Sequence, residues 1–93
     1  MERSAKFTVS DVVEARQLGD ELVLLDLKEG TYFGLDEVGA LIWKEIGSGN
    51  DFGAICDAIC SAYDVIQIEA KTDAQALLSA LMEARLIYRQ EAA

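Results

Sequence analysis

The stretch that decides the fold is DLKEGTYFGLDEVGALIW, residues 26–43, which places a turn, a short aromatic strand and the start of a helix almost without spacers. Gly30 is suited to the left-handed position of a three-residue hairpin loop over residues 28–30, because it carries no Cβ. The sequence TYFGL predicts that residues 31–35 form the short aromatic strand. Asp36 then predicts a helix start, since its carboxylate can accept hydrogen bonds from the free amides of the first turn.

Two more strands precede this stretch. Residues 12–18 alternate imperfectly and predict the first of them, and a Gly19-Asp20 turn follows. Residues 21–27, ELVLLDL, are apolar at nearly every position, which is typical of a central strand. Because short turns join all three strands, they form an antiparallel meander. Strand 31–35 is then a free edge with unpaired backbone groups, unless another segment covers it.

Three helices are predicted after the strands, with apolar side chains recurring at helical spacing. They cover residues 37–46, residues 50 or 51 to 63, and residues 70–85. Residues 64–69 are interpreted as a loop or a brief strand. Strands followed by helices predict an α+β fold class, winged-helix-like, in which a three-stranded antiparallel meander precedes three helices.

The chain ends are expected to contribute little to this fold. A length of 93 residues predicts one domain, which we assign to residues 12–88. Residues 1–11 are interpreted as a flexible N-terminal arm with some order at Phe7 and Val9, and residues 89–93 as a C-terminal tail.

Charge and hydropathy exclude several classes of function. Seventeen acidic and eight basic residues give a net charge of −9, which repels phosphate backbones, so no nucleic-acid partner is expected. The longest apolar runs have four residues, too few to span a membrane, and residues 1–11 lack the apolar core of a signal peptide. No membrane partner is therefore expected. The predicted localisation is cytoplasmic, and two cysteines without a disulfide framework agree with a reducing compartment.

Side chains suited to catalysis or metal binding are scarce. The absence of histidine excludes Ser-His and Cys-His pairs and histidine metal sites. Cys56 and Cys60 lie on the predicted apolar face of the second helix, where free cysteine behaves as a small hydrophobe, with a metal or redox role as the weaker alternative. The scattered acids are interpreted as solvated surface. No catalytic residue, metal site or cofactor is therefore expected.

The adjacent aromatics Tyr32 and Phe33 raise the question of what the edge strand does. Strand side chains alternate, so Phe33 and Leu35 are expected to face the helices and Tyr32 to face away. One interpretation is an idle edge with Phe33 in the core. The other is an edge that accepts an extended peptide as a fourth strand. A groove between this strand and the third helix would use apolar residues that a small sheet does not need. They are Leu77, Leu78, Leu81 and Met82.

Several short motifs follow one another in a fixed order along residues 12–88. They are Leu24-Leu25-Asp26, the arm over residues 30–35, Gly39 with Ile42-Trp43, Tyr63-Asp64-Val65, and a final RLI at residues 85–87. Together they resemble the PqqD-like family, small proteins also called RiPP recognition elements. The resemblance implies a protein that is not an enzyme. Such a protein binds the leader of a ribosomally made precursor peptide and presents its core to modifying enzymes.

The resemblance also implies where a leader would bind. In the family it adds antiparallel to the third strand and packs on the third helix. The corresponding residues here are Thr31, Tyr32, Phe33, Gly34, Leu35, Leu77, Leu78, Leu81, Met82 and Arg85. The chain departs from the family at Arg85, where a GLI-like ending usually has glycine. Arginine is tolerable there because its charge faces the negative end of the helix dipole, and it could pair with an acidic leader residue.

The arm TYFGLDEVGALIW resembles stand-alone proteins of lasso-peptide clusters, whose arm reads like YYGLN-x-x-G-x-x-IW. The implied partners are the precursor leader peptide, a leader peptidase, and a cyclase or another modifying enzyme. Members devoted to pyrroloquinoline quinone usually carry an LNETA-like segment where this chain has LDEVG at residues 35–39. A peptide chaperone of quinone biosynthesis is the alternative.

Two further alternatives stay open on the residues alone. A small winged-helix transcription regulator would place its third helix in a major groove, but residues 70–85 hold only Lys71 and Arg85 as bases. A homodimer could pair its own edge strands across a two-fold axis, so monomer and homodimer are both carried as predictions.

Overall fold

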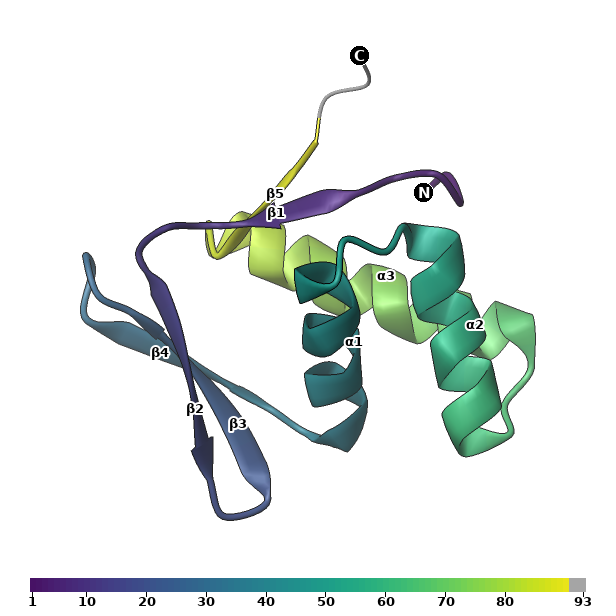
Figure 1. Ribbon diagram of the computed structural model, residues 1–93, viewed down its shortest axis with the longest axis horizontal. Helices are drawn as coiled ribbons and strands as arrows, with labels where there is room; N and C mark the ends of the chain where they lie inside the picture. The colour runs from purple at the N-terminus through teal and green to yellow at the C-terminus, as the bar shows by residue number, and fades with distance from the viewer. Residues whose placement is uncertain (91–93) are drawn as a thin grey trace.

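The structure is a computed structural model that describes residues 1–90, and it places three helices beside a small antiparallel sheet (Figure 1). Its elements in chain order are β1 (Phe7–Val9), β2 (Val13–Leu18), β3 (Glu21–Asp26), β4 (Thr31–Leu35), α1 (Glu37–Gly47), α2 (Phe52–Tyr63), α3 (Gln67–Glu83) and β5 (Ile87–Arg89). The strands β2, β3 and β4 lie to one side of the helices (Figure 1). The short pair of β1 and β5 lies across the upper end of the helices in this view (Figure 1). The predicted α+β fold, a three-stranded antiparallel meander followed by three helices, is confirmed.

The larger sheet has the order β2-β3-β4, so β3 is central and β4 is an edge, as predicted. Leu24 of β3 lies opposite Phe33 of β4 and Ala15 of β2. Its side chain is fully buried, as are those of Ile42 in α1 and Ile55 in α2, and all three belong to one core cluster. The core therefore lies between the inner face of the sheet and the helices.

The turn between β3 and β4 covers residues 27–30, one residue more than predicted, because β3 already ends at Asp26. Asp26 is only 7% exposed, and its carboxylate accepts hydrogen bonds from the amides of Lys28 at 2.9 Å and Glu29 at 3.0 Å. Gly30 adopts the predicted left-handed conformation, with φ of 74°. The turn therefore fixes the residue at which the edge strand begins.

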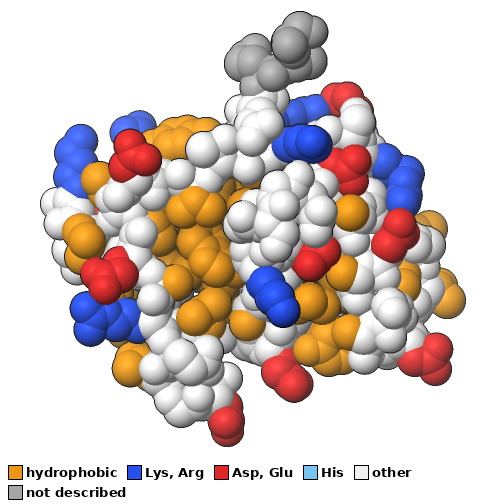
Figure 2. Space-filling view, in the orientation of Figure 1, with side chains coloured by type: hydrophobic (Ala, Val, Ile, Leu, Met, Phe, Trp, Pro, Cys, Tyr) orange, Lys and Arg blue, Asp and Glu red, His pale blue; other side chains and the backbone are white. Residues whose placement is uncertain are grey.

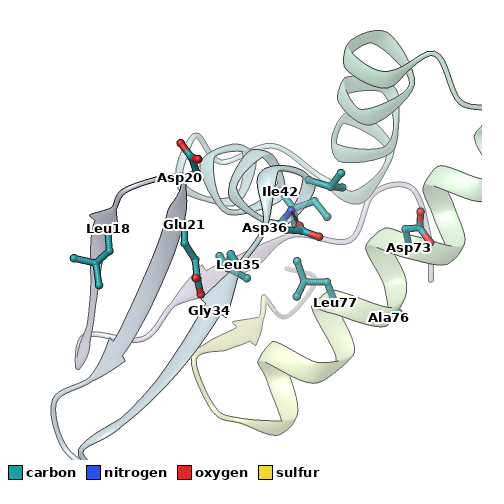
Figure 3. Close-up of a pocket in the computed structure, with 12 residues that line it drawn as sticks. Leu18, Asp20, Glu21, Gly34, Leu35, Asp36, Ile42, Asp73, Ala76 and Leu77 are labelled. Atoms are coloured by element: carbon teal, nitrogen blue, oxygen red, sulfur yellow. Dashed lines mark hydrogen bonds between the residues drawn. The ribbon is translucent and has the colours of Figure 1, made fainter.

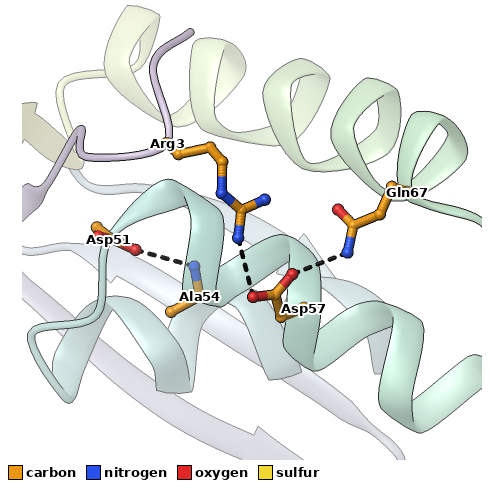
Figure 4. Close-up of polar contacts among 5 residues, drawn as sticks. All are labelled: Arg3, Asp51, Ala54, Asp57 and Gln67. Carbon is orange, nitrogen blue, oxygen red and sulfur yellow. Dashed lines mark hydrogen bonds and ion pairs between the residues drawn. The ribbon is translucent and has the colours of Figure 1, made fainter.

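The helix that follows β4 begins at a side-chain cap, as predicted. The Asp36 carboxylate accepts a hydrogen bond from the Gly39 amide at 2.8 Å, and α1 starts at the next residue after the cap. Asp51 caps α2 in the same way, accepting from Ala54 at 2.9 Å (Figure 4). Because Asp36 directly follows Leu35, this cap fixes the far end of the edge strand.

The N-terminal segment differs from the flexible arm predicted for residues 1–11. Phe7 is buried, and β1 pairs antiparallel with β5 at the other end of the chain. The carbonyl oxygens of Ala5 and Arg3 accept hydrogen bonds, both at 2.8 Å, from the amides of Phe52 and Gly53. These amides belong to the first turn of α2, so they have no hydrogen-bond partner within their own helix. The segment therefore caps a helix and extends the core.

Polar side chains also hold this segment in place (Figure 4). Arg3 forms an ion pair of 2.9 Å with Asp57 of α2, and Asp57 accepts a second hydrogen bond of 2.8 Å from Gln67 of α3. At the other end of the chain, Arg89 of β5 pairs with Glu2. Residue 89, predicted to be part of a tail, is therefore in a strand, whereas residues 91–93 of that predicted tail lie outside the described residues.

The third helix begins at Gln67 and not at residue 70 as predicted. Its N-cap residue is Ile66, which offers no side-chain hydrogen bond, so the usual polar start signal is missing. Thr72 lies inside the helix, where its hydroxyl donates a hydrogen bond to the carbonyl of Ile68 at 2.9 Å. Residues 64–69, interpreted as a loop or a brief strand, are thus partly helical.

The same helix ends in a Schellman motif with an arginine at the position that favours glycine. Ala84 is the C-cap and Arg85 follows it with a left-handed φ of 62°. The Arg85 amide donates to Met82 at 3.0 Å and the Leu86 amide to Leu81 at 2.9 Å, which is the hydrogen-bond pattern of this motif. The helix therefore ends at Glu83, two residues before the predicted end at Arg85, because Arg85 is the left-handed residue of this motif.

We expect Arg85→Gly to stabilise the protein by about 1 kcal/mol, because glycine removes the clash of Cβ in the left-handed conformation. Ala84→Gly is the matched control, since Ala84 has an ordinary helical φ of −78° and glycine there should destabilise by about 0.5–1 kcal/mol. Urea unfolding measures both free energies. A loss of stability in Arg85→Gly would show that the arginine side chain contributes more than its backbone conformation costs.

Candidate peptide-binding site

Two residues of β4 direct their backbone hydrogen-bonding groups away from the sheet. The Leu27 amide donates a hydrogen bond to the Val12 carbonyl at 2.9 Å, so the backbone hydrogen-bonding groups of residue 27 point toward the β2 side of the sheet. Successive residues of a strand direct these groups to alternate sides, so the amides and carbonyls of residues 22, 24 and 26 of β3 point toward β4. Their partners are Leu35, Phe33 and Thr31. The amides and carbonyls of Tyr32 and Gly34, which lie between those partners, therefore point to the open edge.

A groove of about 970 Å³ lies beside this edge, between the end of β4 and the helices (Figure 3). Its residues come from the adjoining ends of β2 and β3 with the turn between them, from β4 and the cap of α1, and from α1 and α3. They are Leu18, Asp20, Glu21, Gly34, Leu35, Asp36, Val38, Gly39, Ile42, Asp73, Ala76 and Leu77. Hydrophobic side chains gather in the hollow between the sheet and the helices (Figure 2). The site thus combines an open strand edge with apolar side chains.

The strand residues predicted to bind a peptide occupy both faces of β4. Leu35 is buried and Phe33 is half-buried against the core, while Thr31 shares their face and is exposed. Tyr32 lies on the outer face and is 76% exposed, and Gly34 lies on the same face. The faces predicted for Tyr32, Phe33 and Leu35 are confirmed.

The predicted residues of the third helix separate into two groups. Leu77 lines the groove and points toward Leu35 in Figure 3. Leu78 and Leu81 have 0% exposure and belong to the core, and Met82 is half-buried against it. The placement of Leu78 and Leu81 in the groove is therefore corrected, because the face of α3 that carries them packs into the core and leaves no surface for a peptide.

Arg85 is exposed just beyond the end of α3 and is not among the residues that line the groove. Several residues that do line it were missed from the sequence. They are Leu18, Asp20, Glu21, Asp36, Val38, Gly39, Ile42, Asp73 and Ala76. Asp73, Ala76 and Leu77 follow one another at i, i+3 and i+4, a helical spacing that could have identified the first two. Asp20 in the β2–β3 turn and Glu21 at the start of β3 carried no such signal.

Thiol chemistry is not favoured at Cys56. Cys56 is buried, Cys60 is half-buried, and both are free thiols. Burial raises the pKa of the Cys56 thiol, although the nearby Arg3 lowers it in part. A thiol that stays protonated is a poor nucleophile and a poor metal ligand. Among residues 1–90, no three His, Cys, Asp or Glu side chains are grouped closely enough to hold a metal ion.

We expect iodoacetamide to alkylate Cys60 well before Cys56 in the folded protein at pH 8, because Cys56 is buried with a raised pKa. Mass spectrometry of tryptic peptides measures both rates, and the urea-unfolded protein, where the two rates should become similar, is the control. Rapid native labelling of Cys56 would place it in an accessible environment and reopen a redox role.

No helix within residues 1–90 is long and apolar enough to cross a membrane. Comparison with curated proteins finds no match to this chain. Two solved structures are similar over most of it. The structure of TbiB1 in complex with the TbiA(beta) leader peptide is 40% identical with a TM-score of 0.81, and the match covers 91% of this chain and 98% of that one.

The second structure, a lasso peptide synthetase B1 complexed with the leader peptide, is 26% identical with a TM-score of 0.83. The match covers 89% of this chain and 98% of that one. The family described as coenzyme PQQ synthesis protein D matches residues 21–87, which contain β3, β4, all three helices and the whole groove except Leu18 and Asp20. The chain therefore belongs to the PqqD family.

Proposed function

We propose that this protein binds the leader segment of a ribosomally made precursor peptide by adding it as a fourth strand to β4. The observation that carries the proposal is the open edge at Tyr32 and Gly34 beside an apolar groove. Both similar structures hold a leader peptide, which supports the same ligand class here. Apolar leader side chains opposite Phe33 and Leu35 would point inward, toward Leu77.

The energetics of such an interface favour moderate affinity. The two outward residues offer two amides and two carbonyls, and each main-chain hydrogen bond contributes about 1 kcal/mol net. Burial of apolar leader side chains must offset the cost of ordering a flexible peptide. We therefore expect dissociation constants of about 1 μM, equivalent to about −8 kcal/mol.

Catalysis would belong to partner enzymes, and this protein would hold and present the substrate. We place it in a lasso-peptide pathway, in which a leader peptidase and a cyclase act on the presented precursor. The similar lasso peptide synthetase B1 supports that pathway. The proposed compartment is the cytoplasm, where the two free thiols stay reduced. The peptide chaperone of quinone biosynthesis remains the second candidate, because the description of the matching family names coenzyme PQQ synthesis.

Isothermal titration tests the proposal with two probes. One is the synthetic TbiA(beta) leader peptide, because the protein that binds it is 40% identical to this chain. The other, called the selected peptide below, is the tightest binder that this protein isolates from a yeast-displayed library of random peptides. We expect one-to-one binding with a dissociation constant of about 1 μM for at least one probe. A protein that binds neither probe would contradict the proposal.

A further inference from the structure

Gly34 is a glycine at a strand position whose backbone does not require one. The left-handed glycines among residues 1–90 are Gly19, Gly30 and Gly49, and Gly34 is not one of them. Glycine weakens a strand, and it often marks a place where another group approaches closely. The approaching group here is Glu21 of β3, because a Cβ added to Gly34 would overlap the Oε1 atom of the Glu21 carboxylate.

The Glu21 side chain reaches across β4 on the outer face of the sheet. Gly34 lies opposite Val23, and Glu21 is two residues before Val23, so all three share this face. Figure 3 shows the Glu21 carboxylate directed toward Gly34. A strand added to β4 would place its residue opposite Gly34 on the same face. No side chain at position 34 would then separate that residue from the Glu21 carboxylate.

The charge of the groove is negative at this point. Within residues 1–90, the ion pairs are Arg3–Asp57, Arg16–Glu14 and Arg89–Glu2, and none of them involves Glu21. Three more carboxylates line the groove, and no lysine or arginine does; they are Asp20, Asp36 and Asp73. An apolar groove with this rim is complementary to a peptide that carries both apolar side chains and a positive charge.

We propose that the groove selects leaders with a Lys or Arg side chain opposite Gly34, and that Glu21 is the specificity-determining residue that pairs with this cation. The inference rests on the proposed strand addition and adds the chemistry of one leader position. Gly34 serves the same selection, because its missing Cβ leaves the space that the Glu21 carboxylate occupies. An exposed ion pair of this kind contributes about two- to five-fold in affinity and weakens with added salt.

Glu14 provides a matched control for Glu21. It lies on β2 opposite Leu25, on the same outer face, and its carboxylate is already paired with Arg16 at 2.9 Å. Glu14→Gln and Glu21→Gln remove the same charge from a chain of net charge −9. Any general attraction between an acidic protein and a basic peptide therefore falls equally in both variants, and only the local pair differs.

The test is a double-mutant cycle between the protein and the selected peptide. We expect the peptides isolated by the wild type to share a Lys or Arg at one fixed distance from their apolar residues. Replacing that residue by Gln should weaken binding about two- to five-fold for the wild type and for Glu14→Gln. The same replacement should change nothing for Glu21→Gln, because the pairing carboxylate is gone. Gly34→Ala, which displaces the carboxylate, should behave like Glu21→Gln.

Two results would overturn the inference while the proposed function stands. One is a set of isolated peptides that share no cation but still bind the Tyr32→Pro variant of the protein about 30- to 150-fold more weakly. The other is a Lys-to-Gln effect that is as large in Glu21→Gln as in the wild type. A library that yields no binder, or binders indifferent to the proline, overturns the inference together with strand addition. Circular dichroism of each variant checks that the fold is retained.

Discussion

Proline in place of Tyr32 is expected to lower the affinity for the probe peptides about 30- to 150-fold while the domain stays folded. The Tyr32 amide points to the open edge, so proline removes a donor that a fourth strand needs but the sheet itself does not. A lost main-chain hydrogen bond with an unpaired acceptor costs about 2–3 kcal/mol, which corresponds to that loss of affinity. Isothermal titration and thermal unfolding measure the two quantities.

Two control variants separate the backbone of Tyr32 from other effects. Ala15→Pro removes an outward amide on β2, the opposite edge of the same sheet, and should leave affinity within about two-fold. Tyr32→Ala removes the ring and keeps the amide, and should weaken binding far less than proline does. Equal losses in Tyr32→Pro and Ala15→Pro would indicate a general disturbance of the sheet and would contradict addition at β4.

Truncation of two leucines on α3 should give opposite results. Leu81 is fully buried in the core, so Leu81→Ala should cost about 3 kcal/mol of unfolding free energy and lower the melting temperature by about 12–24 °C. Leu77 is half-buried and lines the groove, so Leu77→Ala should change stability little. Its loss of apolar surface should instead weaken peptide binding by about 1–2 kcal/mol, or about five- to thirty-fold.

The Leu77 and Leu81 variants decide between the two assignments for this helix when stability and affinity are measured on the same samples. Urea unfolding gives the stability, and titration well below the melting temperature gives the affinity of the folded fraction. If Leu81→Ala weakened binding without loss of stability, the core assignment of Leu81 would be wrong. If Leu77→Ala unfolded the protein and left affinity unchanged, the groove would lie elsewhere.

The fold of the central part of this chain follows from local signals. Gly30 at the turn, the apolar strand around Leu24 and the cap Asp36 each act within a few residues, and the structure has each of them as predicted. The edge position of β4 follows from the order of short connections. The site was therefore predictable as far as the strand, because backbone groups at an edge do not depend on side-chain detail.

The split of the apolar residues on α3 was not predictable in the same way. Adjacent helical residues are about 100° apart, so Leu77 and Leu78 face different directions although both belong to one broad apolar stripe. Which edge of that stripe packs on the core depends on how α3 crosses α2 and α1, and this is not a local property. The structure buries Ala74, Leu78 and Leu81 and leaves Leu77 at the groove.

The role of the N-terminal segment was missed for a related reason. β1 has three residues and pairs with β5 at the opposite end of the chain, so no local periodicity indicates it. The order predicted at Phe7 was the one local signal, and the structure buries Phe7 together with Ala5. The start of α3 was missed because Ile66, its N-cap, provides no polar side chain. Neither the pairing of strands from opposite chain ends nor a helix start without a polar cap can be predicted from local sequence patterns.

The most direct test of the account is amide hydrogen exchange, measured by NMR with and without a saturating probe peptide. The account predicts that the Tyr32 and Gly34 amides exchange rapidly in the free protein and at least about ten-fold more slowly in the complex. The Ala15 and Gln17 amides, on the opposite edge of the sheet, should keep their rates. A peptide that binds without slowing exchange at Tyr32 and Gly34 would contradict strand addition at β4.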